Sequence, residues 1–417
     1  MRKHIKIQVK AADGLMGRIR LLAMALVFAV FAGCSQQEGK VNVIKGPGTA
    51  NSSLMVSFSE LCTGEAEGFA GSPDNLVVSR NNGTERVFSL VNIPTTQTTP
   101  LLSIISGSSP SFQLSPNGRK LLVNDLLYDL DESKKDYLPP VEAEITGKVS
   151  LPSYLPSYSF IGGAEPVLSN PYYYIRRYGN VLPVIALRPF EVAAPRVIPA
   201  GDTTLPKASL NVDLISMPSF LPGELRYLFI GHKNASADPK LYSFDIVNRK
   251  LSQIDTGVGS YAVSPDGGFI AYVKKTRDDD TAERLIIADA NGDAKKELHT
   301  APSIAGIVWS SSSEWLAFSA GEPSRGDVHV IKPDGTSREK LTQGMNAGGK
   351  LAWWGKRLAF TSVNNGISKV YTILLNIEDK GYLPEVQVAP EKQEAYDRLL
   401  EVVRSETLKV RKSGSKV

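Results

Sequence analysis

The chain has 417 residues, of which 42% are hydrophobic and 22% charged, a composition typical of a globular protein with a sizeable core. Its formal net charge of +4 is local, because the first 33 residues carry six Lys and Arg residues against one Asp, which leaves the rest at −1. A nearly neutral body has no long-range field that would attract nucleic acid, so we expect no nucleic-acid partner.

The N-terminal segment predicts export. Residues 1–20 are basic and polar, and residues 21–32 (LLAMALVFAVFA) form an apolar run of twelve that ends in small residues. This is the pattern of a signal peptide, because twelve residues are too few to span a bilayer comfortably. The alternatives are an ordinary signal peptide or a retained anchor helix, either one followed by a chance cysteine.

The residues at the end of this run resemble the lipobox of bacterial lipoproteins, in which small residues precede a cysteine. Residues 31–34 read FAGC, with Phe31 where leucine is usual. The resemblance implies that Cys34 is acylated, and each buried methylene of an acyl chain contributes about 0.8 kcal/mol to membrane binding. In enterobacteria-like sorting, Ser35 implies transfer to the outer membrane. We therefore expect a lipid-anchored protein of the bacterial cell envelope that faces the periplasm.

Only two cysteines are present, Cys34 and Cys62. If Cys34 is acylated, no internal disulfide can form. We then expect Cys62 to be buried and inert, with an intermolecular link as the alternative.

Composition divides the chain into four segments. They are a signal peptide at 1–33, a polar and glycine-rich flexible tether at 34–53, a folded body at 54–389, and a C-terminal helix with a basic tail at 390–417. The helix is predicted because Pro390 is a good first helical residue and an apolar i, i+3, i+4, i+7 pattern follows it.

Short strands that are apolar on both faces recur along the body. They lie at 76–78 (LVV), 121–123 (LLV), 172–174 (YYY), 227–229 (YLF), 270–272 (IAY), 316–318 (LAF) and 358–360 (LAF), 42 to 55 residues apart. Such a strand must be covered on both faces, and this spacing suits four strands and three turns. The pattern predicts an all-β fold, a β-propeller of four-stranded blades, seven by this count.

The turns and side-chain alternation agree with blades. Residues 115–118 (SPNG) and 264–267 (SPDG) fit a type I turn that joins the innermost strand of a blade to the next, and 290–293 (ANGD) and 333–336 (PDGT) form a later turn. In three units the strand carries alanine and then an aromatic residue, at 271–272, 317–318 and 359–360. One face is then shallow and the other bulky, which predicts that blades nest.

Residues 255–362 resemble the TolB-type propeller repeat, a WD-like repeat with a Ser-Pro-Asp-Gly turn, a strand, a hairpin and a closing Leu-Thr. The match includes residues 309–310 (WS), 334–335 (DG) and 341–344 (LTQG). It is partial at 70–125 and poor in the stretch between 125 and 255. The resemblance implies six blades, as an alternative to the seven counted, and it favours protein partners.

The sequence contains few residues that would indicate a catalytic or metal-binding site. The sequence has no Gly-x-Ser-x-Gly, His-Glu-x-x-His or phosphate-binding Gly-Lys-Ser/Thr pattern, and its four histidines share no metal-ligand spacing. His329 alternates with valines, which predicts a strand residue. Residues 289–293 (DANGD) begin like a calcium loop but lack its later ligands, so a hairpin turn is expected. We expect no catalytic residue, metal or cofactor.

An aromatic and basic set in the weakly repetitive middle is the candidate partner-binding surface. It comprises Tyr154, Tyr158, Arg176, Arg177 and Tyr178. Tyrosine and arginine are good interface anchors, and the proline-rich stretches nearby predict long loops on one rim. The alternative for the neighbouring tyrosines 172–174 is that they fill a blade core.

These patterns favour a non-enzymatic protein whose propeller binds or scaffolds an envelope protein partner, because a closed ring is rigid and offers loops from every blade. The alternative is a propeller enzyme or glycan-binding protein that uses the central funnel. The oligomeric state is left open.

Overall fold

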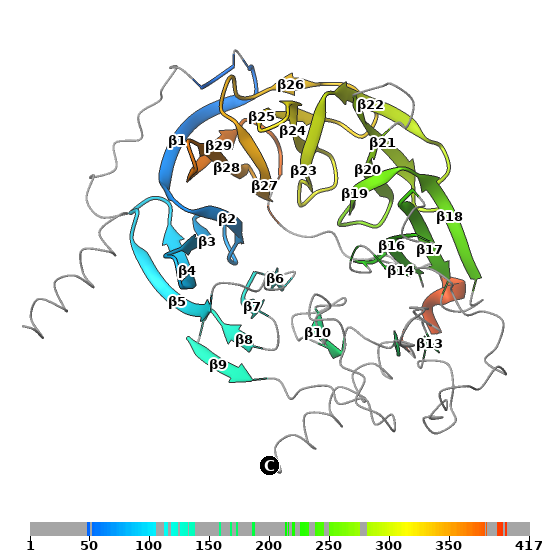
Figure 1. Ribbon diagram of the computed structural model, residues 1–417, viewed down its shortest axis with the longest axis horizontal. Helices are drawn as coiled ribbons and strands as arrows, with labels where there is room; N and C mark the ends of the chain where they lie inside the picture. Colours follow the sequence, from blue (N-terminus) through cyan, green and yellow to red (C-terminus); the bar gives the residue numbers. More distant parts are fainter. Residues whose placement is uncertain are drawn as a thin grey trace, which may run out of the picture.

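The structure is a computed structural model. It describes residues 48–50, 52–105, 112–115, 118–123, 126–131, 133–137, 213–214, 216, 219–221, 226–232, 238–245, 250–275, 282–379, 381, 390–394 and 397, and four two-residue strands between 158 and 187. Within these residues the body is a ring of separate antiparallel sheets (Figure 1). The all-β propeller prediction is confirmed, and the predicted C-terminal helix is present at 390–394 and 397.

Six sheets of four or five strands are present in the described part of the chain. Their strands are β2 (Glu65–Phe69), β3 (Asn75–Asn81), β4 (Glu85–Asn92) and β5 (Thr98–Ile105); β6 (Phe112–Leu114), β7 (Lys120–Val123), β8 (Leu126–Asp129) and β9 (Lys134–Tyr137); β14 (Asp213–Leu214), β15 (Ser219–Phe220), β16 (Arg226–His232), β17 (Lys240–Asp245) and β18 (Lys250–Thr256); β19 (Val258–Val263), β20 (Phe269–Lys275), β21 (Glu283–Asp289) and β22 (Lys296–Ala301); β23 (Ser303–Trp309), β24 (Leu316–Glu322), β25 (Arg325–Ile331) and β26 (Glu339–Lys340); and β27 (Ala347–Trp354), β28 (Arg357–Asn364), β29 (Ile367–Leu375) and β1 (Met55–Thr63).

Two short ladders lie between β9 and β14 in the chain. They pair β10 (Tyr158–Ser159) with β11 (Val167–Leu168), and β12 (Tyr172–Tyr173) with β13 (Ala186–Leu187). The number of seven blades stays a prediction, because the residues around these ladders lie outside the described part of the chain.

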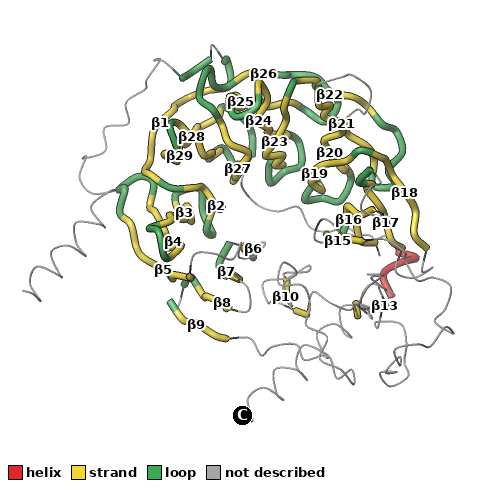
Figure 2. The backbone as a smooth tube through the Cα atoms, in the orientation of Figure 1, coloured by secondary structure: helices red, strands yellow, loops and turns green. Residues whose placement is uncertain are grey.

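Outward from the ring axis, the strands of each sheet follow chain order, except that β1 is the outermost strand of the sheet formed by β27, β28 and β29. Strands β2, β6, β19, β23 and β27 lie innermost, and the last strand of each sheet lies on the outside (Figures 1 and 2). The turn at 264–267 joins β19 to β20, with the Gly267 N–H donating to the Ser264 carbonyl at 2.9 Å. The predicted place of this turn, between the innermost strand and the next, is confirmed.

The ring is closed by the N-terminal strand of the body. Strand β1 pairs antiparallel with β29, from Met55 opposite Leu375 to Thr63 opposite Lys369, and becomes the outer strand of the sheet that the last three strands form. The repeat pattern did not predict this strand, because the first repeat begins at residue 76. Cys62 lies in β1, buried and outside any disulfide, as expected.

Adjacent blades nest through the alternation that the sequence predicted. The fully buried Phe318 of β24 packs in one apolar cluster with Ala271 of β20, and Phe360 of β28 packs with Ala317 of β24. Ala359 of β28 in turn joins the cluster of Leu76 from β3. Each bulky face fills the shallow face of the blade before it, so no blade can bury its core alone.

Bulges recur in the inner strands. The ladder register shifts between Ala66 and Gly68 in β2, between Val258 and Ser260 in β19, between Ala305 and Val308 in β23, and between Ala347 and Leu351 in β27. Gly306 in β23 has φ +65°, and a Cβ there would lie 2.6 Å from the carbonyl oxygen of Gly349 in β27. Glycine therefore lets two inner strands approach backbone to backbone.

This close approach predicts a specific cost for Gly306→Ala. The matched control is Gly344→Ala, because Gly344 has φ +71° with nothing within 4 Å of its Cβ position. Both variants bear the left-handed strain, but only Gly306→Ala also crowds a backbone, so it should lose about 1–3 kcal/mol more in urea unfolding. Equal losses in the two variants would show that the inner strands are not in contact at this point.

Candidate functional site

Charged residues occupy two of the inner-strand bulges. Glu67 lies in the bulge of β2 and Lys350 in that of β27, on the two sides of the seam where the ring closes. The corresponding bulges hold Gly259 in β19 and Gly306 with Ile307 in β23. A bulge takes a residue out of the ladder and re-aims its side chain. Of these four inner strands, the two that direct charged side chains toward each other are β2 and β27, at the closing seam.

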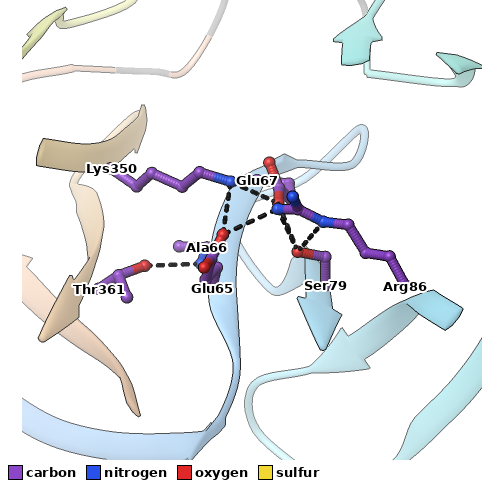
Figure 3. A network of polar contacts seen from close by, with 7 residues as sticks. All are labelled: Glu65, Ala66, Glu67, Ser79, Arg86, Lys350 and Thr361. Carbon is purple, nitrogen blue, oxygen red and sulfur yellow. Dashed lines mark hydrogen bonds and ion pairs between the residues drawn. The ribbon is translucent and has the colours of Figure 1, made fainter. Parts of the chain in front are cut away.

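The charges form a closed network (Figure 3). Lys350 Nζ lies 2.7 Å from Glu67 Oε1 and 2.8 Å from Glu65 Oε2, and Arg86 Nη2 lies 2.6 Å and 2.8 Å from the same two oxygens. Ser79 Oγ donates to Glu67 Oε1 at 2.5 Å and accepts from Arg86 Nε at 3.0 Å. Two cations and two carboxylates therefore alternate around one ring.

A neutral hydrogen bond supports the same seam. The Ala66 N–H of β2 donates to Thr361 Oγ1 of β28 at 2.9 Å, and both groups are buried (Figure 3). Thr361 belongs to the last blade and Ala66 to the first complete one. This bond therefore holds the two blades together beside the charged network.

The network is half-buried and favours the ionised form of Glu65. The Glu67 side chain is 7% exposed and that of Lys350 38%. Burial alone would raise the pKa of Glu65, but the hydrogen bond from Lys350 and the positive charges of Lys350 and Arg86 outweigh it, so this pKa lies below its ordinary value. A carboxylate stabilised in this way accepts hydrogen bonds and is a weak proton acceptor, so the arrangement suits binding better than acid–base catalysis.

A second cluster of titratable groups lies between two blades. His299 of β22 and His329 of β25 have ring centroids 5.3 Å apart, and both lie against the buried Phe318, at 5.2 and 5.4 Å. Arg338 Nη1 lies 3.1 Å from His299 Nδ1. Burial, His299 and Lys340 lower the pKa of His329 to about 4, against an opposing effect of Asp327. His329 is a strand residue, as predicted, and packs as a neutral ring.

The predicted acylation site and most of the predicted partner-binding set lie outside the described part of the chain. Cys34, Tyr154, Arg176, Arg177 and Tyr178 lie outside the described residues. Tyr158 lies in β10, with its backbone opposite Leu168. These residues keep their predicted roles as predictions.

The calcium-like stretch is a hairpin turn, as expected. Asp289 Oδ1 accepts the N–H groups of Asn291 and Asp293, each at 2.9 Å, between β21 and β22. Within the described part of the chain, no three His, Cys, Asp or Glu side chains gather as metal ligands would. The helical residues of that part include no stretch long and apolar enough to cross a membrane.

Comparison with known proteins identifies the fold. No family model and no curated protein matches the chain. Among solved structures, an oligogalacturonate lyase in complex with manganese is 12% identical with a TM-score of 0.51, over 79% of this chain and 97% of that one. A putative TolB from Agrobacterium tumefaciens is 13% identical with a TM-score of 0.39, over 74% and 95%. At these identities the likeness extends to the β-propeller fold alone.

The histidine cluster predicts an acid-sensitive component of stability. The folded-state pKa of His329 is lowered from 6.5 to about 4, so as pH falls through this window the unfolded chain binds a proton that the folded chain does not. Stability is lost on acidification, by roughly 2–3 kcal/mol between pH 7 and 4. Urea unfolding of His329→Phe across this range should show a smaller loss of unfolding free energy on acidification than wild type, whereas parallel profiles would exclude a neutral, partly buried His329.

Proposed function

We propose that the chain is a lipid-anchored protein of the bacterial envelope whose propeller binds another protein and acts as a scaffold. The single observation that carries the binding function is the charged network aimed by facing bulges at the inner edge of the closing seam. The network is backed by Ser79 and Thr361, so its side chains are positioned before a partner arrives.

An exposed apolar side chain lies beside the β27 bulge that also carries Lys350. Val363 of β28 is 41% exposed, and a Cβ at Gly348 of β27 would lie 3.3 Å from Val363 Cγ2. Gly348 is exposed and stands two residues before Lys350. We call Val363, Gly348, Lys350 and Glu65 the seam patch. An exposed apolar side chain next to charged side chains that can form ion pairs with another protein is typical of interfaces that form and dissociate.

The anchoring part of the proposal rests on the sequence. Residues 21–34 have the signal-peptide and lipobox pattern, and thirteen residues separate Cys34 from the first described residue, Gly48. Such a segment, fully extended, spans roughly 45 Å, which allows a folded body to work at a distance from the membrane. Ser35 supports the outer membrane as the location, facing the periplasm.

The proposal predicts that partner capture depends on the seam patch. After in-cell crosslinking, Val363→Asp should recover a specific envelope protein at least tenfold less than wild type, a loss of about 1.4 kcal/mol or more of binding, because a carboxylate placed in an apolar contact loses its hydration. The control is Ile367→Asp, because Ile367 is 56% exposed on the same hairpin and points to its opposite face. Cys34→Ala should move the protein from the membrane to the soluble fraction.

Two results would overturn this assignment. Equal capture by Val363→Asp and Ile367→Asp would exclude the seam patch. Absence of any specific envelope partner, together with glycan binding or glycan turnover by the body, would favour the alternative of a funnel-using enzyme or glycan-binding protein.

A further inference from the structure

The chain contacts another blade before it enters the closing strand. The described residues 48–50 and 52–54, which we call the strap, contact the end of the β23–β26 sheet, whereas β1 belongs to the sheet of β27–β29. The Ala50 N–H donates to the Leu341 carbonyl at 3.0 Å, and the Gln343 N–H donates to the Gly48 carbonyl at 3.0 Å. Thr49 forms an antiparallel bridge with Thr342. The strap thus extends the edge of a blade to which β1 does not belong.

One carboxylate fastens the second half of the strap. Glu339 of β26 accepts from Ser52 Oγ, from Ser53 Oγ at 2.6 Å and from the Leu54 N–H at 3.3 Å. Burial alone would raise the pKa of Glu339, but the hydrogen bonds from both serines outweigh it and the pKa lies below its ordinary value. Hydrogen bonds to an ionised group are stronger than neutral ones, so Glu339 is the firmest single contact of the strap.

The order of these contacts along the chain has a mechanical consequence. Force on a polypeptide is opposed first by the first fixed contact that it meets, and here the strap precedes Met55, the first residue of β1. A pull that reached β1 directly would open its pairing with β29 from the Met55–Leu375 end, one neutral hydrogen bond at a time. Because the strap precedes β1 in the chain, tension from the N-terminal side must break the strap contacts before it reaches β1.

We propose that the strap is a strain-relief clamp: its contacts with Glu339 and residues 341–343 take up tension on the N-terminal tether, so that the β1–β29 pairing carries none. The source of that tension, a membrane anchor at Cys34, rests on the proposed function. The clamp itself rests on the contacts of residues 48–50 and 52–54. It gives a lipid-anchored ring a means of staying closed while its partner or its membrane moves.

The test is a force ramp on the full non-acylated chain from Cys34 onward, with handles at the Cys34 thiol and the C-terminus; Cys62 is buried and does not compete. Wild type should show an early release that lengthens the chain by roughly 25 Å, the span of seven residues, before the ring opens. Glu339→Gln should lower the force of that release about twofold or abolish it, because it removes the ionised acceptor.

Glu314→Gln is the matched control, since Glu314 is an exposed residue on another turn of the same blade and should leave the release unchanged. Hydrogen exchange gives a bulk check: Glu339→Gln should speed exchange of the 50–54 amides about tenfold, with β1 unchanged. A first release near 55 Å, which would include β1, or identical traces for Glu339→Gln and wild type, would overturn the clamp. Failure of Cys34→Ala to leave the membrane would instead refute the anchor and leave the clamp result standing.

Discussion

The fold depends on one non-covalent pairing, that of β1 with β29. Neighbouring blades in the described part of the chain bury apolar faces against each other, so a ring that opens at one such contact exposes two faces at once. The strand from the N-terminal end of the body completes the last sheet and places Cys62 in the apolar cluster of the next blade. Ring closure is therefore a packing event as well as a hydrogen-bonding one.

The same closure creates the candidate site. Inner strands of a propeller crowd toward the axis, and glycine bulges relieve the crowding, as Gly306 against Gly349 shows. At the closing seam the bulged residues are Glu67 and Lys350, and the geometry that elsewhere brings backbones together here brings opposite charges within 2.7 Å. The same kind of bulge that brings backbones together elsewhere in the ring thus brings opposite charges together at the closing seam.

Local patterns predicted the repeating part of the fold because their causes are local. Alternation of Ala317 with Phe318 specifies two unlike faces, and the Ser264 turn specifies a reversal, whatever lies elsewhere in the chain. The β1–β29 pairing and the seam network join residues about 300 positions apart, and no periodic pattern marks residues 55–63 as the missing strand.

The charged network at the closing seam could not be predicted from the sequence for a related reason. Residues 348–350 read Gly-Gly-Lys and residues 65–67 read Glu-Ala-Glu, which are ordinary stretches until bulges aim them at each other. Charge beside glycine in an otherwise apolar inner strand is the one signal that the sequence offers. Cys34, by contrast, was singled out by its resemblance to a lipobox and the tyrosine–arginine set by residue type, and of these only Tyr158 lies within the described residues.

The most direct test of ring closure is a disulfide across the pairing. Ser59 Oγ and Thr372 Oγ1 lie 2.9 Å apart on facing positions of β1 and β29. The chain with Ser59→Cys and Thr372→Cys should form an intramolecular disulfide under native oxidising conditions, seen as one linked peptide pair, and should gain several kcal/mol against unfolding. Failure of the two cysteines to link in the folded protein, or linkage between separate chains, would contradict a ring closed by its own N-terminal strand.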